Sequence, residues 1–294
     1  MTTDLLAAEL VGLEGGAFLM GSEEGEGYPA DGEHPVRHVR VPGFRISATT
    51  VTNRQFAAFV ADTAHVSAAE SAGWSFVFAG LLPDDFGPTR GVASAPWWRQ
   101  VEHASWAHPE GPGSDIADRE DHPVVHVSWD DARAWCAWAG GRLPTEARWE
   151  YAARGGISRA RYPWGDELNP GGAHLCNVWQ GTFPSLNTAE DGFYGTAPVR
   201  SFPPNGYGLY EVAGNVWEWC ADWSDPEIGR RDDRDDPLGP PSGTQRVMRG
   251  GSFMCHESYC HRYRVAARSA NTPSSTTSNL GFRWMAEPEE EKRT

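Results

Sequence analysis

The sequence predicts a single α+β domain in which irregular structure predominates. Its 294 residues lie near the upper size for one hydrophobic core. They include 33 glycines and 22 prolines, which interrupt regular structure and favour long, ordered loops. Neither a repeat of fixed period nor a clear linker divides the chain. We therefore expect residues 10–286 to form one domain and residues 287–294 a charged tail.

Helices are expected at three places. The first begins at Thr52, whose hydroxyl can form a capping box with Gln55, and an apolar face follows. The second begins at Ser128 and ends at a Gly-Gly pair. The third begins at Thr145, directly after a proline, and also ends at a Gly-Gly pair.

Short apolar runs between Gly, Pro and Asn predict the strands. Residues 10–22 alternate apolar residues with glycine and indicate a strand followed by a turn. Further strands are expected over 122–129, 246–254 and 280–285. The acidic and basic residues of 225–244 indicate a surface loop. The helices are thus outnumbered by short strands.

Charge and hydropathy exclude several classes of function. The formal charge is −15, so a nucleic-acid partner is not expected, because phosphate binding needs clustered Lys and Arg. No apolar run approaches the roughly 18–20 residues that cross a bilayer, so we expect no membrane partner. The N-terminal residues lack the basic start of a secretory signal. With five cysteines and no such signal, we expect a reducing, cytoplasmic setting.

Cys255 and Cys260 stand out because a C-x4-C pair fits neither common cysteine motif. A structural zinc site needs a second pair of ligands, and a thioredoxin-like site needs C-x-x-C beside a βαβ unit. Two thiols alone suit either a redox disulfide or a soft ion such as Cu(I). The other three cysteines, Cys136, Cys176 and Cys220, are expected to be buried small hydrophobic residues.

Longer motifs give a family resemblance. The runs GNVWEWCADW, RVMRGGSFMCHESYCHRYRVAARSANTP and NLGFR together resemble the formylglycine-generating enzymes, or sulfatase-modifying factors, of prokaryotic type. The likeness extends from about Gly12 to Met285, and its specific part is the C-x4-C pair. It implies a compact C-type-lectin-like domain with little regular secondary structure.

The resemblance also implies an activity. Members of this family use dioxygen to convert a cysteine within a Cys-x-Pro-x-Arg motif of a sulfatase to Cα-formylglycine. Cu(I) is then held by the thiolates of Cys255 and Cys260, and the substrate cysteine joins as a third sulfur. The expected partner is an unfolded or nascent sulfatase polypeptide, and the chain is expected to be a monomer.

Further site residues follow from matching positions. Ser252 matches a family serine near the reactive sulfur, and His256 and Tyr259 flank the cysteine pair. All three are expected to have catalytic roles, although strand alternation can turn His256 or Tyr259 outward. Trp217, Arg268 and Asn279 match positions near the substrate. Two alternatives stay open, since Trp217 is nearly as well explained as a core residue and Arg268 as a structural ion-pair partner.

The resemblance implies one calcium site and suggests a second. Oxygen ligands suit a hard cation such as Ca²⁺. The first set is Asn177, Val178, Asp191 and Phe193, and the second is Glu211, Gly214, Val216 and Glu218. Asn177 and Asp191 have an alternative role as turn caps. The second set departs from some members, which have asparagine where this chain has Glu211.

Two further departures concern disulfides and substrate arginine. Secreted members carry disulfides at positions occupied here by the pairs Cys136 and Trp284, and Ala153 and Val265. This supports a cytoplasmic setting. The acidic residues that hold the substrate arginine in some members correspond here to Thr50 and Trp74, which leaves the binding of that arginine open.

Two other functions remain as alternatives on this fold. An iron-dependent sulfoxide synthase would need a histidine triad, and His122 and His126 lack an evident third ligand, so structural roles are favoured for both. A non-catalytic binding module would leave Cys255 and Cys260 without a role.

Overall fold

The computed structural model describes residues 9–23, 25–230 and 234–288 and shows one α+β domain dominated by loops. Its helices are α2 (Asn53–Thr63), α3 (Ala68–Ala72), α4 (Trp129–Trp138) and α5 (Glu146–Ala153), with short 3-10 turns η1 (Pro29–Asp31), η2 (Ala79–Leu81), η3 (Pro170–Gly172) and η4 (Ile228–Arg230). Its strands are β1 (Leu10–Leu13), β2 (Gly16–Met20), β3 (Arg37–Val41), β4 (Phe44–Ser47), β5 (Trp74–Phe78), β6 (Arg90–Val92), β7 (Ala95–Glu102), β8 (Gly181–Thr182), β9 (Leu186–Asn187), β10 (Trp217–Trp223), β11 (Arg246–Arg249), β12 (Arg268–Asn271), β13 (Leu280–Gly281) and β14 (Met285–Ala286).

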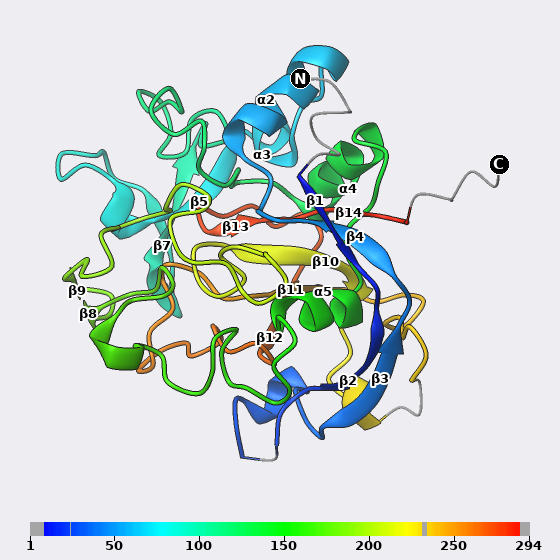
Figure 1. Ribbon diagram of the computed structural model, residues 1–294. Helices are drawn as coiled ribbons and strands as arrows, with labels where there is room; N and C mark the ends of the chain where they lie inside the picture. Colours follow the sequence, from blue (N-terminus) through cyan, green and yellow to red (C-terminus); the bar gives the residue numbers. More distant parts are fainter. Residues whose placement is uncertain (1–8, 24, 231–233, 289–294) are drawn as a thin grey trace.

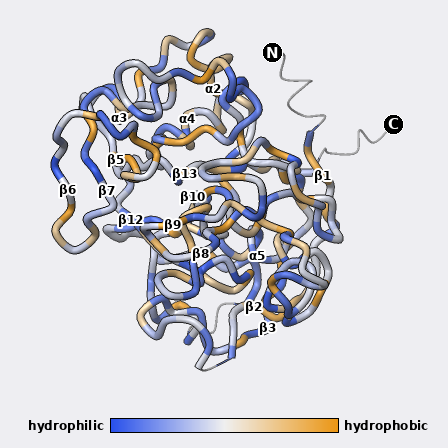
Figure 2. Tube along the Cα trace, turned by 90° about the vertical axis from the view of Figure 1, so that its left-hand side faces the viewer, coloured by the Kyte–Doolittle hydropathy of each residue, from blue (hydrophilic) through white to orange (hydrophobic). Residues whose placement is uncertain are grey.

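The strands form several small sheets. A four-stranded sheet with the order β12-β11-β10-β13 runs through the middle of the molecule (Figure 1). Three-stranded sheets β1-β4-β14 and β5-β7-β6 and the β2-β3 and β8-β9 pairs surround it. Figure 2 shows β5, β6 and β7 on the opposite side of the molecule from β2 and β3. The central sheet is the platform on which the site is built.

The three predicted helix starts are confirmed. The Thr52 side chain accepts from the backbone N–H of Gln55, and the Gln55 side chain accepts from the Thr52 N–H, which completes the capping box. Ser128 begins α4 with the same reciprocal arrangement, and Thr145 caps α5 through its hydroxyl. Helix α4 ends at Trp138, with Ala139 as its C-cap directly before the predicted Gly-Gly pair. Local signals were sufficient because a cap needs only residues within one turn.

The strand predicted over 122–129 is wrong. The segment forms only an isolated bridge between Pro123 and Thr52. Its backbone N–H groups pair with separate parts of the chain: Val124 with the Val51 carbonyl and His126 with that of Thr277. His126 also has a φ of 60°, which breaks the extended conformation. The segment 122–129 therefore has the alternating apolar residues of a strand but crosses between other elements without joining a sheet.

The closing strand predicted over 280–285 is divided into β13 and β14, which belong to different sheets. Between them Phe282, Arg283 and Trp284 are buried. The strand predicted at the start of 10–22 is confirmed by β1, and a second strand, β2, follows within the same range. Strand β11 confirms the first part of the 246–254 prediction. Of the predicted tail 287–294, residues 289–294 lie outside the described part of the chain.

Two large apolar clusters fill the domain. One contains Trp135, Trp219 and Phe282 together with both Cys255 and Cys260, and the other surrounds α5. The predicted burial of Cys136, Cys176 and Cys220 is confirmed, and all five cysteines are free thiols. In the ranges that the structure describes, no helix has the length and apolar character of a membrane span.

Candidate active site

The cysteine pair lies in the wall of a cavity of about 180 Å³. The central sheet supplies one side of the cavity: Met248 from β11, Ser269 and Asn271 from β12, Trp217 from β10 and Leu280 from β13. The segment 252–262 and Trp98 of β7 supply much of the rest. A concave, partly apolar site with a few polar groups is typical of a ligand-binding pocket.

Local turns bring the two cysteines together. Gly250 and Gly251 both have positive φ, and a Cβ on Gly251 would lie 3.0 Å from the backbone of Tyr263. The chain then turns twice, because the Cys255 N–H donates to the Ser252 carbonyl and the Cys260 N–H to the His256 carbonyl. The two Sγ atoms are consequently 3.1 Å apart, well beyond a disulfide bond length of about 2.05 Å.

The two thiols have different acidities. A hydrogen bond from the Cys255 thiol, together with the backbone N–H and the guanidinium of Arg262, lowers the pKa of Cys260 to about 7 against the effect of burial. Burial and the neighbouring Cys260 raise the pKa of Cys255. The first proton lost by the pair is therefore assigned to Cys260, which leaves a thiolate that accepts from the Cys255 S–H. A thiolate is the nucleophilic and metal-binding form of cysteine.

Arg262 is a site residue that the sequence analysis did not single out. Its Nη1 lies 3.8 Å from Cys260 Sγ. The Asp31 carboxylate accepts from two nitrogens of the same guanidinium, and the guanidinium carbon lies 3.9 Å from the Tyr28 ring centroid. Its position two residues after Cys260 was the available signal. The charge is thus fixed beside the sulfur by segments more than 200 residues away in the sequence.

The structure places Ser252 and Asn279 together in the cavity wall. Asn279 Nδ2 donates to Ser252 Oγ at 2.8 Å, and the Thr277 hydroxyl donates to Asn279 Oδ1 at 2.8 Å. All three residues line the cavity. The Ser252 side chain opposes the rise in the pKa of Cys255. This chain of bonds orients the hydroxyl of Ser252 relative to the thiol pair.

Tyr259 and His256 lie differently. Tyr259 lines the cavity, is 41% exposed and stacks on Phe183 with ring centroids 4.6 Å apart. Burial of its inner part raises the pKa of Tyr259 to about 12, so the hydroxyl remains protonated at neutral pH. His256 does not line the cavity, and its Nδ1 contacts the Ser258 hydroxyl at 2.8 Å. Of the neighbours of the two cysteines, His256 is therefore the one that faces away from the cavity.

Trp217 and Arg268 also differ in placement. Trp217 lines the cavity and is 8% exposed, so it is both a core residue and a wall of the site. Arg268 does not line the cavity. Its Nε and Nη2 donate to the two oxygens of Glu146 at 2.7 and 2.8 Å, and its Nη1 to the Asp31 carbonyl. The structural ion-pair alternative is therefore the one that the arrangement of Arg268 supports.

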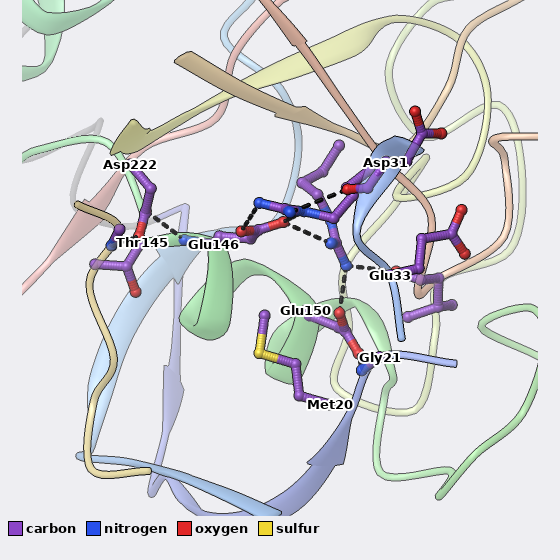
Figure 3. Close-up of polar contacts among 12 residues, drawn as sticks. Met20, Gly21, Asp31, Glu33, Thr145, Glu146, Glu150 and Asp222 are labelled. Atoms are coloured by element: carbon purple, nitrogen blue, oxygen red, sulfur yellow. Dashed lines mark hydrogen bonds and ion pairs between the residues drawn. The ribbon is translucent and has the colours of Figure 1, made fainter. Parts of the chain in front are cut away.

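Arg268 is part of a buried ion-pair network. Figure 3 shows two carboxylates of this network, Glu146 and Glu150 of α5. Arg249, at the end of β11, donates to Glu146 and Glu150 of α5 at 2.8 and 2.5 Å. Glu150 also accepts from Arg154, and the Gly21 N–H donates to its Oε1. The network joins α5, β11, β12 and the segment around Gly21. It therefore fixes the strand from which the cysteine segment begins.

The first predicted calcium set converges in part. The Gln180 side-chain nitrogen donates both to the Val178 carbonyl and to Asp191 Oδ2, so these two oxygens point at one position. Burial raises the pKa of Asp191, and the hydrogen bonds from Gln180 and Phe193 oppose this rise only in part. Asn177 is buried, and its amide nitrogen donates to the carbonyl of Gly195 at 2.8 Å. Oxygens that converge on one point fit a hard cation.

The second predicted calcium set does not converge in this way. Both oxygens of Glu218 accept from Arg283, at 2.6 and 2.7 Å, and one also accepts from the Trp149 indole. A cation beside this carboxylate would meet the positive charge of Arg283. Glu211 accepts from the backbone N–H groups of Arg200 and Phe202. The donor set therefore does not fit a second calcium ion.

His122 and His126 have the structural surroundings that were favoured for them. His122 Nδ1 contacts the Thr196 hydroxyl, and His126 Nδ1 contacts the Ser75 hydroxyl at 2.7 Å. Complete burial lowers the pKa of His126 to about 3, so this ring is neutral. Over the described ranges, no group of three or more His, Cys, Asp or Glu side chains is arranged to hold a metal ion.

Comparison with known proteins identifies the relatives of this chain. The Sulfatase-modifying factor enzyme 1-like domain family matches residues 2–288. The chain belongs to this family. It is 58% identical over 287 residues to a formylglycine-generating enzyme of Thermomonospora curvata, covering 96% of this chain and 95% of the relative.

Further relatives agree with the family assignment. A formylglycine-generating enzyme of Streptomyces coelicolor is 59% identical over 274 residues, covering 93% of this chain and 87% of the relative. Among solved structures, that of PvdO from Pseudomonas aeruginosa superimposes with a TM-score of 0.65 at 26% identity, covering 95% of this chain and 94% of PvdO. The family resemblance and the single α+β domain predicted from the sequence are confirmed.

Proposed function

We propose that this chain is a copper-dependent formylglycine-generating oxidase. Its substrate is the cysteine of a Cys-x-Pro-x-Arg segment in an unfolded or nascent sulfatase, and dioxygen is the electron acceptor. The observation that carries the proposal is the buried pair of free thiols, 3.1 Å apart, in the wall of a cavity. The high identity to two bacterial formylglycine-generating enzymes gives that pair its context.

The thiol pair fits copper by the chemistry of its donors. Among the described residues that line the cavity there is no carboxylate or imidazole. Two thiolates alone suit a soft monovalent ion better than calcium or magnesium, which prefer oxygen ligands, or zinc, which takes four ligands. When bound by Cys255 and Cys260, Cu(I) would carry electrons from the substrate CH2SH group to dioxygen. An iron-dependent oxidase is less well supported, because it would need a histidine triad.

The chain's own residues prepare the site for a cysteine side chain. Arg262 stabilises the thiolate of Cys260 and so favours the metal-binding form at neutral pH. Trp217 and Trp98 cover parts of the cavity wall and limit the access of water. Ser252, held by Asn279, presents a hydroxyl next to Cys255. Together these groups bind and orient the substrate thiol beside the pair.

Calcium has a structural role in this proposal. Ca²⁺ would be held by Asn177, Val178, Asp191 and Phe193, where the Val178 and Asp191 oxygens already converge. Its charge would offset the burial of Asp191 and fix the loop that leads to β8 and β9. No calcium is proposed at Glu211 and Glu218.

The test is conversion of a synthetic Cys-x-Pro-x-Arg peptide by copper-loaded protein in the presence of dioxygen. We expect the cysteine CH2SH group to react with one water to give an aldehyde and hydrogen sulfide, while dioxygen takes up the two electrons and is reduced to hydrogen peroxide. The aldehyde is detected by mass and by hydrazine labelling. A peptide with serine in place of cysteine is the substrate control. The Cys176→Ser variant, which changes a buried thiol outside the pair, is the matched protein control and should retain turnover.

Absence of aldehyde with copper and dioxygen present would contradict the proposal. Unchanged peptide binding by a Cys255→Ser, Cys260→Ser double variant, together with no turnover by the unmodified protein, would favour a binding module. We further propose a monomer that acts in the cytoplasm without nucleic-acid or membrane partners. Cys136 is a free thiol, and Trp284 occupies the position of its disulfide partner in secreted members, which supports a reducing compartment.

A further inference from the structure

The cavity offers no carboxylate to the arginine of a Cys-x-Pro-x-Arg substrate. Among the described residues that line it, Arg262 is the one charged side chain, and its charge is positive. A second guanidinium is therefore repelled there. Thr50 stands at one of the two positions where some family members have an acidic residue for the substrate arginine, and here it is 1% exposed and carries no charge. The substrate arginine must be bound outside the cavity.

One face of the β5-β7 pair leads away from the cavity. Antiparallel register sets Trp98 opposite Phe78, Gln100 opposite Phe76, and Glu102 opposite Trp74. Directly opposed residues project to the same face, and alternate residues along a strand share it. We call the accessible residues of this face the β7 track: Trp98, Gln100, Glu102, Phe76 and Trp74. The track begins in the cavity, because Trp98 lines it, and it ends at Glu102, which is exposed.

Two observations show that this is the accessible face. Ser75, Val77 and Val101, which alternate with the track residues, are buried, so the other face is covered by the domain. Phe76 also forms a parallel bridge with Thr277, which lines the cavity. The track is therefore continuous with the cavity at both Trp98 and Thr277.

The length of the track matches the substrate motif. Trp98 and Glu102 are four residues apart on one strand, which spans roughly 13–14 Å at about 3.4 Å per residue. The cysteine and arginine of Cys-x-Pro-x-Arg are also four residues apart, and an extended chain covers about the same distance. A peptide whose cysteine enters the cavity can thus place its arginine at the far end of the track.

The far end has the chemistry that recognises a guanidinium. Glu102 is an exposed carboxylate, to which the Gln100 amide donates a long hydrogen bond of 3.5 Å. Trp74 lies opposite it and is held at 81° against the Phe76 ring, with centroids 5.0 Å apart. Arginine combines a charge for the carboxylate with a planar face that stacks on indole. We propose that Glu102 and Trp74 bind the arginine of the substrate.

This inference rests on the proposed function and is tested first by binding. The probe is a fluorescent Ser-x-Pro-x-Arg peptide, which lacks the reactive thiol, measured by anisotropy. Glu102→Gln and Trp74→Leu should each weaken binding about five-fold, the upper range for an exposed ion pair and a cation–π contact. Asp84→Asn, which neutralises an exposed carboxylate after η2, is the matched control and should bind as the unmodified protein does.

Charge reversal supplies a test that a merely structural role would not pass. Glu102→Arg should lose affinity for the arginine peptide and gain affinity for Ser-x-Pro-x-Glu. Thermal melting measured for each variant separates folding from binding. If Glu102→Gln and Trp74→Leu bind the arginine peptide as the unmodified protein does, this subsite is refuted.

Turnover distinguishes the two proposals. If the unmodified, copper-loaded protein does not convert Cys-x-Pro-x-Arg, the proposed function fails. If it does, Glu102→Gln should raise KM for that peptide about five-fold with kcat nearly unchanged. Conversion with the same KM in Glu102→Gln and in Asp84→Asn would overturn the arginine subsite and leave the proposed function standing.

Discussion

Replacement of Arg249 by methionine tests whether the buried ion-pair network holds the fold under the cysteine pair. Arg249 is 1% exposed and donates to Glu146, Glu150 and the Val265 carbonyl. Methionine keeps much of the volume and removes the charge. Glu146 then retains Arg268 and Glu150 retains Arg154, so each carboxylate keeps one of its two cations.

The expected cost is large because the charges left behind are buried. Removing one partner of a buried ion pair typically lowers the free energy of unfolding by about 3–5 kcal/mol. That is a substantial part of the roughly 5–15 kcal/mol that stabilises a typical domain. We therefore expect Arg249→Met to fold at low temperature and to unfold at a much lower urea concentration than the unmodified protein.

The pH dependence of this loss gives a sharper test. Burial opposes ionisation of both Glu146 and Glu150, but Arg268 and Arg249 at Glu146, and Arg154 and Arg249 at Glu150, hold both pKa values below the usual range. Stability from such groups is complete above the unfolded pKa of about 4.3 and is lost as pH falls through the folded values. Without Arg249 both pKa values rise. The difference between variant and unmodified protein should thus be largest near pH 7 and shrink towards pH 4.

Urea unfolding followed by tryptophan fluorescence at several pH values measures both effects. Arg54→Met is the matched control, since Arg54 is half exposed and pairs only with exposed carboxylates, and its unfolding free energy should stay nearly unchanged. A loss in Arg249→Met that is as small as in the control would refute the reasoning. So would a large loss that is independent of pH, because it would point to packing instead of charge.

Three further predictions concern the site. Cys255→Ser should abolish binding of one equivalent of Cu(I), measured by competition with a chromophoric chelator, whereas Cys176→Ser should bind it normally. Alkylation of the unloaded protein by iodoacetamide should increase through about pH 7, because Cys260 loses its proton there. Arg262→Met should move the midpoint of this increase upward by about one pH unit, and an unmoved midpoint would contradict the role of Arg262. Calcium should raise the melting temperature of the protein, and Asp191→Asn should remove that increase; an equal increase in the variant would place the ion elsewhere.

Local sequence was enough to predict the parts of this protein that depend on neighbouring residues. The caps at Thr52, Ser128 and Thr145 were correct because a capping side chain and the N–H that it binds lie within one helical turn. The C-x4-C pair was identified as the centre of the site because its spacing is unusual and its surrounding motif is specific. Burial of the other three cysteines followed from their residue type.

Only the tertiary structure decided which distant residues meet. The segment 122–129 has the composition of a strand, yet its N–H groups find partners in separate segments, which no local pattern records. Arg262 beside Cys260 depends on Asp31 and Tyr28, and the β7 track depends on the register of β5 with β7. Such contacts join residues far apart in the chain and arise from the packing of whole elements. The sequence by itself therefore determined the family and the helix starts and singled out the thiol pair, whereas the fold decided the separation of the two thiols, their charge environment and the surface that leads to them.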